Sequence, residues 1–413
     1  MVNRAIAFPL PEDLEDVLDG LERFVKSEVI DVHEANAELL EDVRQRFGPN
    51  GAYSPEVVDI IRRIRMASAK AGYFNLAVPE HMGGGGMGHL AYFAAWERIY
   101  HLCGGRRWLA QFAISHWAFG PSAVLERISE RAKEDVLPAM LAGESMMCFG
   151  MSEPDAGSDA TMMRTRAEPD GGGWRLYGRK IWTTHVPIAE WMIVLAVTNP
   201  ERAKARRGGI SAFLVPTDSE GFRLDRVIGM WGEPGGSEAE SVFDGVRVEP
   251  WQLVGELDEG FQIGLLGVSL GRIYNTARSV GLSRWALELA IDYAKQRQAF
   301  GKPISEYQGV AFPLAESATD IHAAHLLGCN AAALLDGGHR AVKELSMAKT
   351  FAVRAAVRAV DRAMQTHGAM GFTNEMGLTD AYHVLRVINV ADGTNEILNR
   401  TIFQRLAGGD TEL

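Results

Sequence analysis

The chain contains 413 residues, of which 47% are hydrophobic and 23% charged, and it carries a formal net charge of −11 at pH 7. This length predicts two or three packed domains, and the acidic balance argues against non-specific nucleic-acid binding, which needs a basic surface. Three scattered cysteines, the lack of an apolar run of roughly 18 residues and the lack of a signal-peptide pattern predict a cytoplasmic protein without disulfide framework, metal site or membrane span.

The first of three predicted regions, residues 1–145, is mainly helical. The stretch EDLEDVLDGLERFVKSEVI spaces its apolar residues at three and four and begins with acidic residues, as an amphipathic helix does. Glycine and proline in VPEHMGGGGMG predict a loop, after which helical patterns resume from Leu90 through Leu141.

The second region, residues 146–255, changes to short runs rich in β-branched and aromatic residues. These runs are WRLYGRKIWTT, WMIVLAVTN, GISAFLVPTD and AESVFDGVRV. Turn residues such as the glycines at 171–173 separate them, and no long helical pattern comes between them. The pattern predicts a small antiparallel β domain and not a βαβ sheet.

The third region, residues 256–413, is helical again. Long helices are expected at roughly 260–299, 304–335, 340–368 and 394–407. Their alanine-rich faces suit close packing in a four-helix bundle. The predicted fold is therefore mainly α with a central β domain.

Two short matches to catalytic motifs lack the structural context that each motif needs. Gly83, Gly85 and Gly88 match G-x-G-x-x-G, but they follow a helical pattern and not a strand, so a loop is expected. Residues 267–271 match the G-x-S-x-G of a hydrolase elbow, yet the surrounding spacing is helical. A serine hydrolase acting through Ser269 remains an alternative of a different class, which Ser269→Ala would test.

Three other stretches offer groups suited to a flat heteroaromatic ring, a thioester or a phosphate. CFGMSEPDAGSDA, residues 148–160, is a strand end and turn with hydroxyls and free backbone N–H groups, although such turns more often only cap a strand. KIWTTHV places the Trp182 face and the Thr184 hydroxyl on one side of a strand, although a core tryptophan is the commoner use. In KQRQAFGKPISEYQ, Arg297 is either a fork for phosphate or a solvated residue at a helix end.

Taken together, the motifs resemble those of a known family. MSEPDAGSD, RQAFGKPISEYQ and DGTNEI, in this order, are similar to the signatures of acyl-CoA dehydrogenases, and the resemblance runs from AGYFNLAVPEHMGG to the final helix. That family consists of flavoproteins that oxidise acyl thioesters to α,β-enoyl thioesters. The resemblance implies FAD as cofactor, an acyl-CoA as substrate, and electron-transferring flavoprotein or a similar acceptor as partner.

The resemblance also assigns roles to individual residues. The implied FAD contacts are Phe149, Met151, Ser152, Trp182, Thr183, Thr184, Arg297, Phe300, Gln308, Gln365, Gly368, Thr394 and Glu396. Arg297, Phe300 and Gln308 resemble the set that reaches the FAD of a neighbouring subunit, so a homodimer or homotetramer is implied. The implied contacts to the substrate are Gly157, Ser158, Arg272 and Gly393.

Asp392 stands where the family usually carries a glutamate base before Gly-Thr, and the resemblance makes it the expected catalytic base. Removing the weakly acidic α-proton of a thioester needs a carboxylate of raised pKa in a dry pocket. Some members carry the base just before the arginine that corresponds to Arg272, but that position holds Gly271 here. From the residues alone, a helix cap at Asp392 or Thr394 is an open alternative, and both roles can hold together.

Departures from the family pattern bear on the substrate. Asp392 is shorter than glutamate by about one C–C bond (roughly 1.5 Å), and Ala391 and Gly271 are small, which predicts a cavity for a branched, cyclic or otherwise bulky acyl group. Ser269 replaces an aspartate that often contacts the CoA arm, which leaves open whether the carrier is CoA or a carrier protein. An aspartate base also resembles the nitroalkane oxidase branch of the fold. A non-catalytic acyl-carrier-binding homologue is a further alternative.

Overall fold

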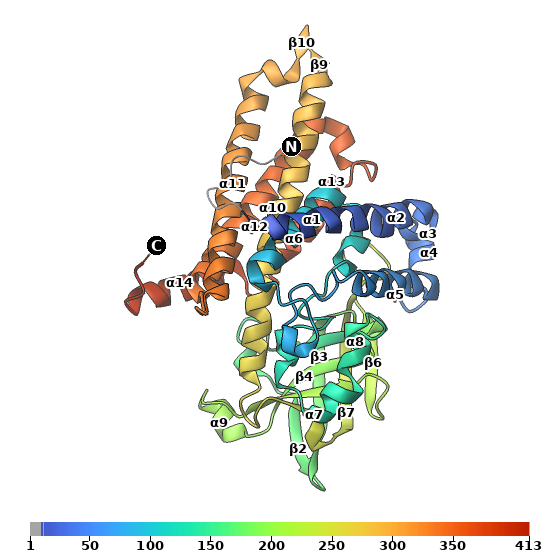
Figure 1. The fold of residues 1–413 in the computed structure, drawn as a ribbon, viewed down its shortest axis with the longest axis vertical. Helices are drawn as coiled ribbons and strands as arrows, with labels where there is room; N and C mark the ends of the chain where they lie inside the picture. The colour runs from blue at the N-terminus through green and yellow to red at the C-terminus, as the bar shows by residue number, and fades with distance from the viewer. Residues whose placement is uncertain (1–9, 11, 413) are drawn as a thin grey trace. The chain divides into compact units, whose positions relative to one another are not determined.

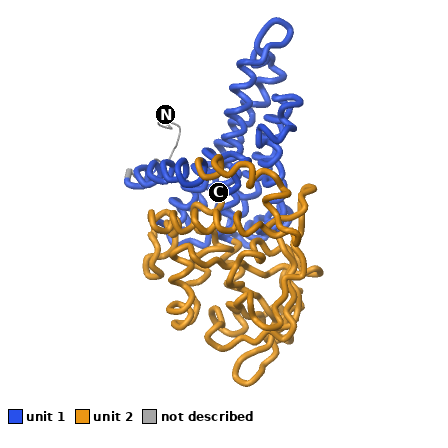
Figure 2. Tube along the Cα trace, turned by 90° about the vertical axis from the view of Figure 1, so that its right-hand side faces the viewer, with its two compact units in different colours: residues 1–30, 87–110, 269–413 blue, residues 31–86, 111–268 orange. Residues whose placement is uncertain are grey.

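A computed structural model describes residue 10 and residues 12–412 (Figure 1). The chain forms two compact units, coloured separately in Figure 2. Unit 1 comprises Met1–Ile30, Met87–Ala110 and Ser269–Leu413, and unit 2 comprises Asp31–Gly86 and Gln111–Val268. Each unit combines segments distant in sequence, so the units are not consecutive stretches of chain, and the division at residues 145 and 255 stays a prediction.

Unit 1 consists of long helices. They are α1 (Glu12–Val25), α6 (Gly88–Cys103), the part of α10 (Phe261–Gln296) from Ser269 onward, α11 (Gln308–Asp336), α12 (Val342–His367), α13 (Leu378–Ile388) and α14 (Asn395–Ala407). α12 packs against α11, α13 and α14, while α6 packs against α1 and α11. Close approach depends on small residues, because a Cβ added at Gly281 of α10 would lie 2.5 Å from the Glu97 carbonyl oxygen of α6.

The helical predictions for this part hold, with two differences. The turn between α10 and α11 contains a short hairpin, β9 (Gln298–Ala299) and β10 (Lys302–Pro303), and α13 was not predicted. α13 buries Leu378, Ala381, Leu385 and Ile388, a spacing of three, four and three residues that a helix requires. Its short length and the glycines that precede it conceal that signal.

Unit 2 contains an eight-stranded sheet with strand order β6-β7-β3-β2-β4-β5-β8 and with β1 paired to β4. The strands are β1 (Met147–Gly150), β2 (Arg166–Asp170), β3 (Gly173–Thr184), β4 (Trp191–Val197), β5 (Ile210–Pro216), β6 (Phe222–Val227), β7 (Glu238–Val248) and β8 (Leu253–Val254). Most pairs are antiparallel, as predicted, but β4 pairs in parallel with β1 and with β2.

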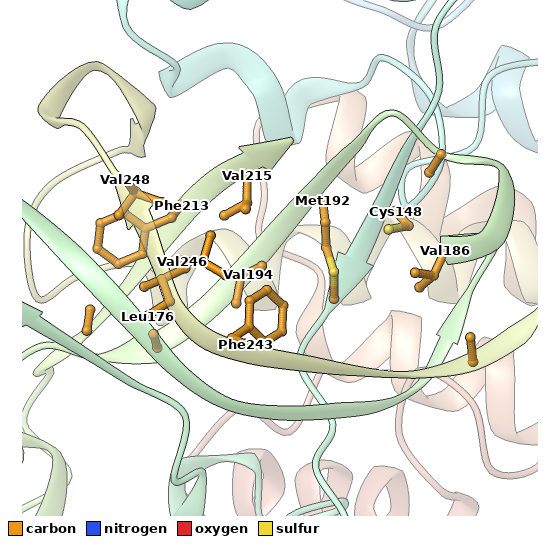
Figure 3. Close-up of a cluster of buried hydrophobic side chains, with 14 residues drawn as sticks. Cys148, Leu176, Val186, Met192, Val194, Phe213, Val215, Phe243, Val246 and Val248 are labelled. Atoms are coloured by element: carbon orange, nitrogen blue, oxygen red, sulfur yellow. The ribbon is translucent and has the colours of Figure 1, made fainter. Parts of the chain in front are cut away.

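A hydrophobic core fills one side of this sheet (Figure 3). Its largest members come from β3, β4, β5 and β7, and they are Leu176, Met192, Val194, Phe213, Val215, Phe243, Val246 and Val248. Each of these side chains is at most 2% exposed, and burying such a side chain contributes roughly 1.5–3 kcal/mol. The core therefore fixes the sheet from which the loop after β1 projects.

The remaining helices of unit 2 are short, apart from α5 (Pro55–Lys70). They are α2 (Asp31–Ala35), α3 (Ala37–Glu41), α4 (Val43–Arg46), α7 (Glu130–Asp135), α8 (Leu137–Leu141) and α9 (Pro200–Lys204). The helical expectation from Leu90 to Leu141 is wrong over residues 104–129, which hold only short 3-10 turns. Gly104 at φ +64 ends α6, and Pro121 lacks the N–H that a helix needs.

The two formal motif matches, G-x-G-x-x-G and G-x-S-x-G, lie in a loop and a helix, as the surrounding sequence predicts. Gly83–Gly86 form a loop after the 3-10 turn Glu80–Met82, and Ser269 lies inside the continuous helix α10. Neither has the strand-to-helix turn that its formal motif requires. Within residues 12–412, no helix combines the length and apolar character needed to cross a membrane.

Candidate active site

Asp392 lies in the turn between α13 and α14, in a backbone conformation that is unusual for its residue type. Its φ is +52, and the following Gly393 has a φ of +95. A left-handed conformation at a residue other than glycine is uncommon and often marks a functional position. The N-cap of α14 is Thr394, whose hydroxyl accepts a hydrogen bond of 3.3 Å from the backbone N–H of Ile397. Of the two residues that could cap α14, Thr394 is therefore the one that does so. The Asp392 carboxylate is left available for another role.

The turn is held by donors from two helices of unit 1. The Asn275 amide of α10 donates to Asp392 Oδ2 at 2.7 Å. Arg272, three residues earlier, donates from Nε to the Asp392 carbonyl oxygen at 3.4 Å, and Lys349 of α12 donates from Nζ to the Gly393 carbonyl oxygen at 2.8 Å. The two cations therefore bind the backbone of the turn, while the neutral amide binds the carboxylate.

The electrostatics of this cluster bring the Asp392 carboxyl closer to neutrality. Burial raises the pKa of Asp392 to about 6, against the opposing effects of Lys349, Arg272 and the Asn275 hydrogen bond. Burial also lowers the pKa of the fully enclosed Lys349 to about 8, although Asp392 attracts its charged form. Asp392 itself keeps a partly exposed surface. A carboxyl with a pKa in this range is suited to proton transfer near neutral pH.

The loop after β1, in unit 2, carries Met151 and Ser152 and is held from inside by an ion pair. Lys180, which is fully buried in β3, donates to the Met151 carbonyl oxygen at 3.1 Å and to Glu153 Oε1 at 2.8 Å. Glu153 also accepts hydrogen bonds from the backbone N–H groups of residues 164 and 165. Burial lowers the pKa of Lys180 to about 8, and Glu153 opposes this shift. These contacts fix the loop at the position where the flavin contacts were predicted.

Further along the same loop, Gly157 and Ser158 are exposed. A Cβ added at Gly157 would meet no atom within 4 Å. At the start of the loop, Phe149 is largely buried, and its ring lies 5.1 Å from that of Trp117. The loop thus has a fixed base and an open tip.

Trp182, Thr183 and Thr184 lie at a β-bulge. The pairing of β3 with β7 shifts register between Lys180 and Thr183, so one extra residue lies on β3. Trp182 has a φ of +59 and is 56% exposed, whereas Thr183 is buried and its hydroxyl has no hydrogen-bond partner among the described residues. A bulge redirects side chains out of the regular alternation, and here it presents a flat indole face beside a buried polar atom.

The remaining predicted cofactor residues lie in unit 1. Arg297, Phe300 and Gln308 are exposed and lie in or next to the hairpin of β9 and β10 (Figure 1). Phe300 lies between the two strands and is 98% exposed. Gln365 and Gly368 are exposed at the end of α12. The hairpin residues and the end of α12 lie close together, since the ring of His367 lies 4.5 Å from that of Tyr293, four residues before Arg297. They form one group at the hairpin.

The other two predicted cofactor residues of unit 1, Thr394 and Glu396, lie beside the Asp392 turn. Lys349, which binds that turn, is sixteen residues before Gln365 in α12, a rise of roughly 24 Å. The predicted cofactor residues of unit 1 therefore form two separate groups, one at the turn and one at the hairpin.

Sequence reasoning missed two residues of the Asp392 cluster. Asn275 follows Arg272 by three residues and so lies on the same face of α10, which a search for polar neighbours on that face would have found. Lys349 is a lysine within an alanine-rich, buried helical face, which is itself a signal because lysine is rarely buried without a partner. Gly393 was predicted, and its Cβ position would lie 3.6 Å from Arg272 Nη2.

Comparison with known proteins accounts for nearly the whole chain. Models of the N-terminal, middle and C-terminal domains of acyl-CoA dehydrogenase match residues 11–144, 148–246 and 258–407. An acyl-CoA dehydrogenase of Bacillus subtilis is 35% identical over 343 residues, covering 82% of this chain and 88% of the relative. The caffeyl-CoA reductase-Etf complex subunit CarC of Acetobacterium woodii is 32% identical over 371 residues, covering 89% and 94%.

The fold is also found among solved structures. Butyryl-CoA dehydrogenase of Megasphaera elsdenii superimposes with a TM-score of 0.80 at 27% identity, covering 97% of this chain and 100% of that one. The chain has helical terminal regions and a middle sheet, as these relatives do. Together with the matches, this fold defines a flavoprotein oxidoreductase. The chain belongs to the acyl-CoA dehydrogenase family, a family of flavoproteins, and its relatives support an oxidoreductase that acts on acyl-CoA.

Proposed function

We propose that the protein catalyses α,β-dehydrogenation of an acyl-CoA with Asp392 as the catalytic base. The observation that carries the proposal is the state of the Asp392 carboxylate. It does not cap α14, one of its oxygens is bound by Asn275, and burial raises its pKa to about 6. A carboxylate that only capped a helix would accept backbone N–H bonds, which lower the pKa of an acid.

The chemistry assigns a separate task to each residue of the turn. Asp392 accepts the α-proton as the α C–H bond breaks, and the electron pair remains on the substrate as an enolate. Arg272 and Lys349 bind the adjacent carbonyl oxygens and place positive charge near the developing negative charge. When bound, FAD supplies the acceptor for the β-hydride.

The side chains at the bulge and the loop of unit 2 fit a flavin. The exposed face of Trp182 offers a stacking surface, and the buried Thr183 hydroxyl has an unused hydrogen-bonding capacity that a heteroaromatic ring edge would satisfy. Phe149, Met151, Ser152 and Thr184 complete the proposed set. The ion pair beneath the loop supports this assignment because it holds the backbone still.

The two separate groups in unit 1 support a shared cofactor. Thr394 and Glu396 belong to the Asp392 turn, whereas Arg297, Phe300, Gln308, Gln365 and Gly368 gather near the hairpin. A nearly fully exposed Phe300 is costly on a free surface, and contact with a second copy of the chain removes it from water. We infer a homodimer or homotetramer in which the hairpin group serves the FAD of a neighbouring subunit.

The substrate follows from the size of the residues near the base. Asp392 is short and Ala391 and Gly271 are small, which supports a branched, cyclic or otherwise bulky acyl group. The exposed tip at Gly157 and Ser158 is the proposed contact to the acyl-CoA, together with Arg272 and Gly393. The Acetobacterium relative is a subunit of a complex with Etf, and we propose that electron-transferring flavoprotein is the acceptor here.

An anaerobic titration tests the proposal. The purified protein with FAD is mixed with butyryl-, octanoyl-, isobutyryl- and cyclohexanecarboxyl-CoA, and loss of the oxidised flavin absorbance is followed in parallel for Asp392→Asn. We expect bleaching by the branched or cyclic thioesters, and FAD retention without bleaching in the variant. Faster and more complete bleaching by butyryl- and octanoyl-CoA than by the branched and cyclic thioesters would refute the bulky-substrate assignment.

Two other outcomes would favour other functions. If the protein with FAD is incubated with nitroethane in air, hydrogen peroxide formation without any CoA ester would indicate a nitroalkane oxidase. A flavin that no thioester reduces would indicate a non-catalytic carrier-binding protein. A hydrolase at Ser269 is disfavoured because that residue lies within α10 and not at a strand-to-helix turn.

A further inference from the structure

Asn275 binds the carboxylate that we propose as the base, across 117 residues of sequence. Its side chain comes from α10, is 4% exposed, and donates from Nδ2 to Asp392 Oδ2 at 2.7 Å. The Asn275 carbonyl oxygen accepts a hydrogen bond from Ser279, one turn later in α10. The amide therefore projects from a fixed helix onto a turn whose own backbone conformation is unusual.

We propose that Asn275 is a positioning residue for the base: its amide fixes Oδ2 of Asp392, so that Oδ1 is the oxygen that accepts the α-proton. This inference rests on the proposed function. After transfer, the proton resides on Oδ1 as a carboxylic acid, Oδ2 keeps the hydrogen bond from Asn275, and the electron pair of the broken C–H bond stays with the thioester. No further reactant is needed for this half of the reaction.

The need for such a residue follows from the short side chain of aspartate. A displacement of about 1 Å at a reacting group can lower a rate by about 100-fold, so a base with less reach has less tolerance for rotation about its side-chain bonds. A hydrogen bond from a buried amide on a rigid helix removes that rotation. A neutral donor also suits the position, because it cannot take the proton that the base must accept.

The amide also sets the balance of charge around the base. The charged and titratable groups around the cluster are Arg272 of α10, Lys349 of α12, Tyr92 of α6 and Glu396 of α14. Burial disfavours the ionised carboxylate, and the Asn275 hydrogen bond favours it. Removal of the amide alone therefore leaves the surrounding charges unchanged and raises the pH at which the base becomes active.

The test is the pH dependence of anaerobic flavin reduction in the FAD-loaded protein, with whichever thioester of the panel bleaches it. Asn275→Leu removes the donor at similar volume, and Asn275→Asp replaces it with a second carboxylate. We expect the midpoint of the pH profile to rise by about one unit for Asn275→Leu and further for Asn275→Asp, since like charges raise a carboxyl pKa. We also expect a rate above the midpoint that is about ten-fold lower for Asn275→Leu.

Controls separate positioning from folding. Ser283→Ala removes a buried hydroxyl two turns further along α10, where it donates to the Ser279 carbonyl oxygen, and is expected to leave the midpoint unchanged. If Asn275→Leu does not retain FAD, the smaller Asn275→Ser supplies the same readout. An unchanged midpoint in all Asn275 variants, with Asp392→Asn inactive, would overturn the positioning role and leave the proposed function standing. Reduction of Asp392→Asn at the wild-type rate would instead overturn the proposed function itself.

Discussion

Two irregular segments carry most of the proposed chemistry, and they are stabilised in different ways. The loop after β1 in unit 2 is held by the buried ion pair of Lys180 and Glu153, in which each charge neutralises the other. The Asp392 turn in unit 1 is held by Lys349 and Arg272, which bind carbonyl oxygens and leave the carboxylate to a neutral amide. Paired charges suit a segment that must stay rigid, whereas incompletely paired charges suit one that must exchange a proton.

The pKa shifts follow the same division. In the loop, burial opposes ionisation of Glu153, yet the Lys180 charge prevails and the pKa of Glu153 is lowered. In the turn, burial prevails and the pKa of Asp392 rises. Lys180 and two backbone N–H groups donate to the Glu153 carboxylate, whereas Lys349 donates to the backbone of the turn and Asn275 to the Asp392 carboxylate. The donors on the carboxylate itself therefore favour the charged form of Glu153 more than that of Asp392.

Breaking the ion pair of the loop should give the largest effect. Lys180→Met leaves the Glu153 carboxylate buried without its partner, which costs about 3–5 kcal/mol of folding free energy. Chemical denaturation of the single variant and of Lys180→Met/Glu153→Gln measures it, and the double variant should recover most of the loss. A single variant as stable as the wild type would show that the pair does not hold the loop.

Removing the cation of the turn should change the reaction more than the fold. Lys349→Met deletes the donor to the Gly393 carbonyl oxygen and a charge that favours ionised Asp392. We expect flavin reduction about ten-fold slower, which corresponds to one hydrogen bond to a charged group, with a midpoint at higher pH and FAD retained. Lys295→Met, at an exposed position of α10, is the control. Equal rates in the two variants would contradict the role of Lys349.

The raised pKa of Asp392 also predicts a pH dependence of stability. The pKa of the Asp392 carboxyl is about 6 in the folded protein against an ordinary value of 3.8, so the protonated carboxyl stabilises the fold fully below pH 3.8, and this contribution is lost as pH rises through 6. The side chain of Asp392→Asn cannot ionise, so the variant does not lose this contribution to the free energy of unfolding as pH rises. The variant should match the wild type near pH 4 and exceed it by about 1–3 kcal/mol at pH 7, as measured by denaturation at both pH values. A difference independent of pH would show that burial does not disfavour the charged form.

The smallest expected effect concerns the unpaired hydroxyl at the bulge. Thr183→Val should change the stability of the FAD-free protein by at most about 1 kcal/mol, because the lost group has no partner among the described residues. FAD binding should weaken by up to about ten-fold if the cofactor uses that hydroxyl. Ser241→Ala removes another buried hydroxyl without a described partner, from β7, and should leave FAD affinity unchanged. Equal affinity in both variants would place the flavin elsewhere.

The sequence located both segments but not what holds them. Local patterns predicted the strands, the long helices and the motifs, because periodicity and turn residues are local signals. The bulge at Trp182 depends on the register of β3 against β7, and the bond from Asn275 to Asp392 joins residues 117 apart. Helix α13 was missed because it is short and follows glycines, and the helical expectation over residues 104–129 overlooked the local breaks at Gly104 and Pro121. Thr394 was one of two open caps, and only the geometry of the turn distinguished it from Asp392.

The most direct test of the central claim isolates proton removal from oxidation. A 3-thia-acyl-CoA has an acidic α-proton and a sulfur in place of the β-carbon, so it exchanges that proton without transferring a hydride. Its α-deuteration in D2O can be followed by mass spectrometry with the FAD-loaded protein and with Asp392→Asn. We expect exchange with the wild type and a rate about 100- to 10,000-fold lower with the variant. Exchange at the wild-type rate in Asp392→Asn would show that another group is the base.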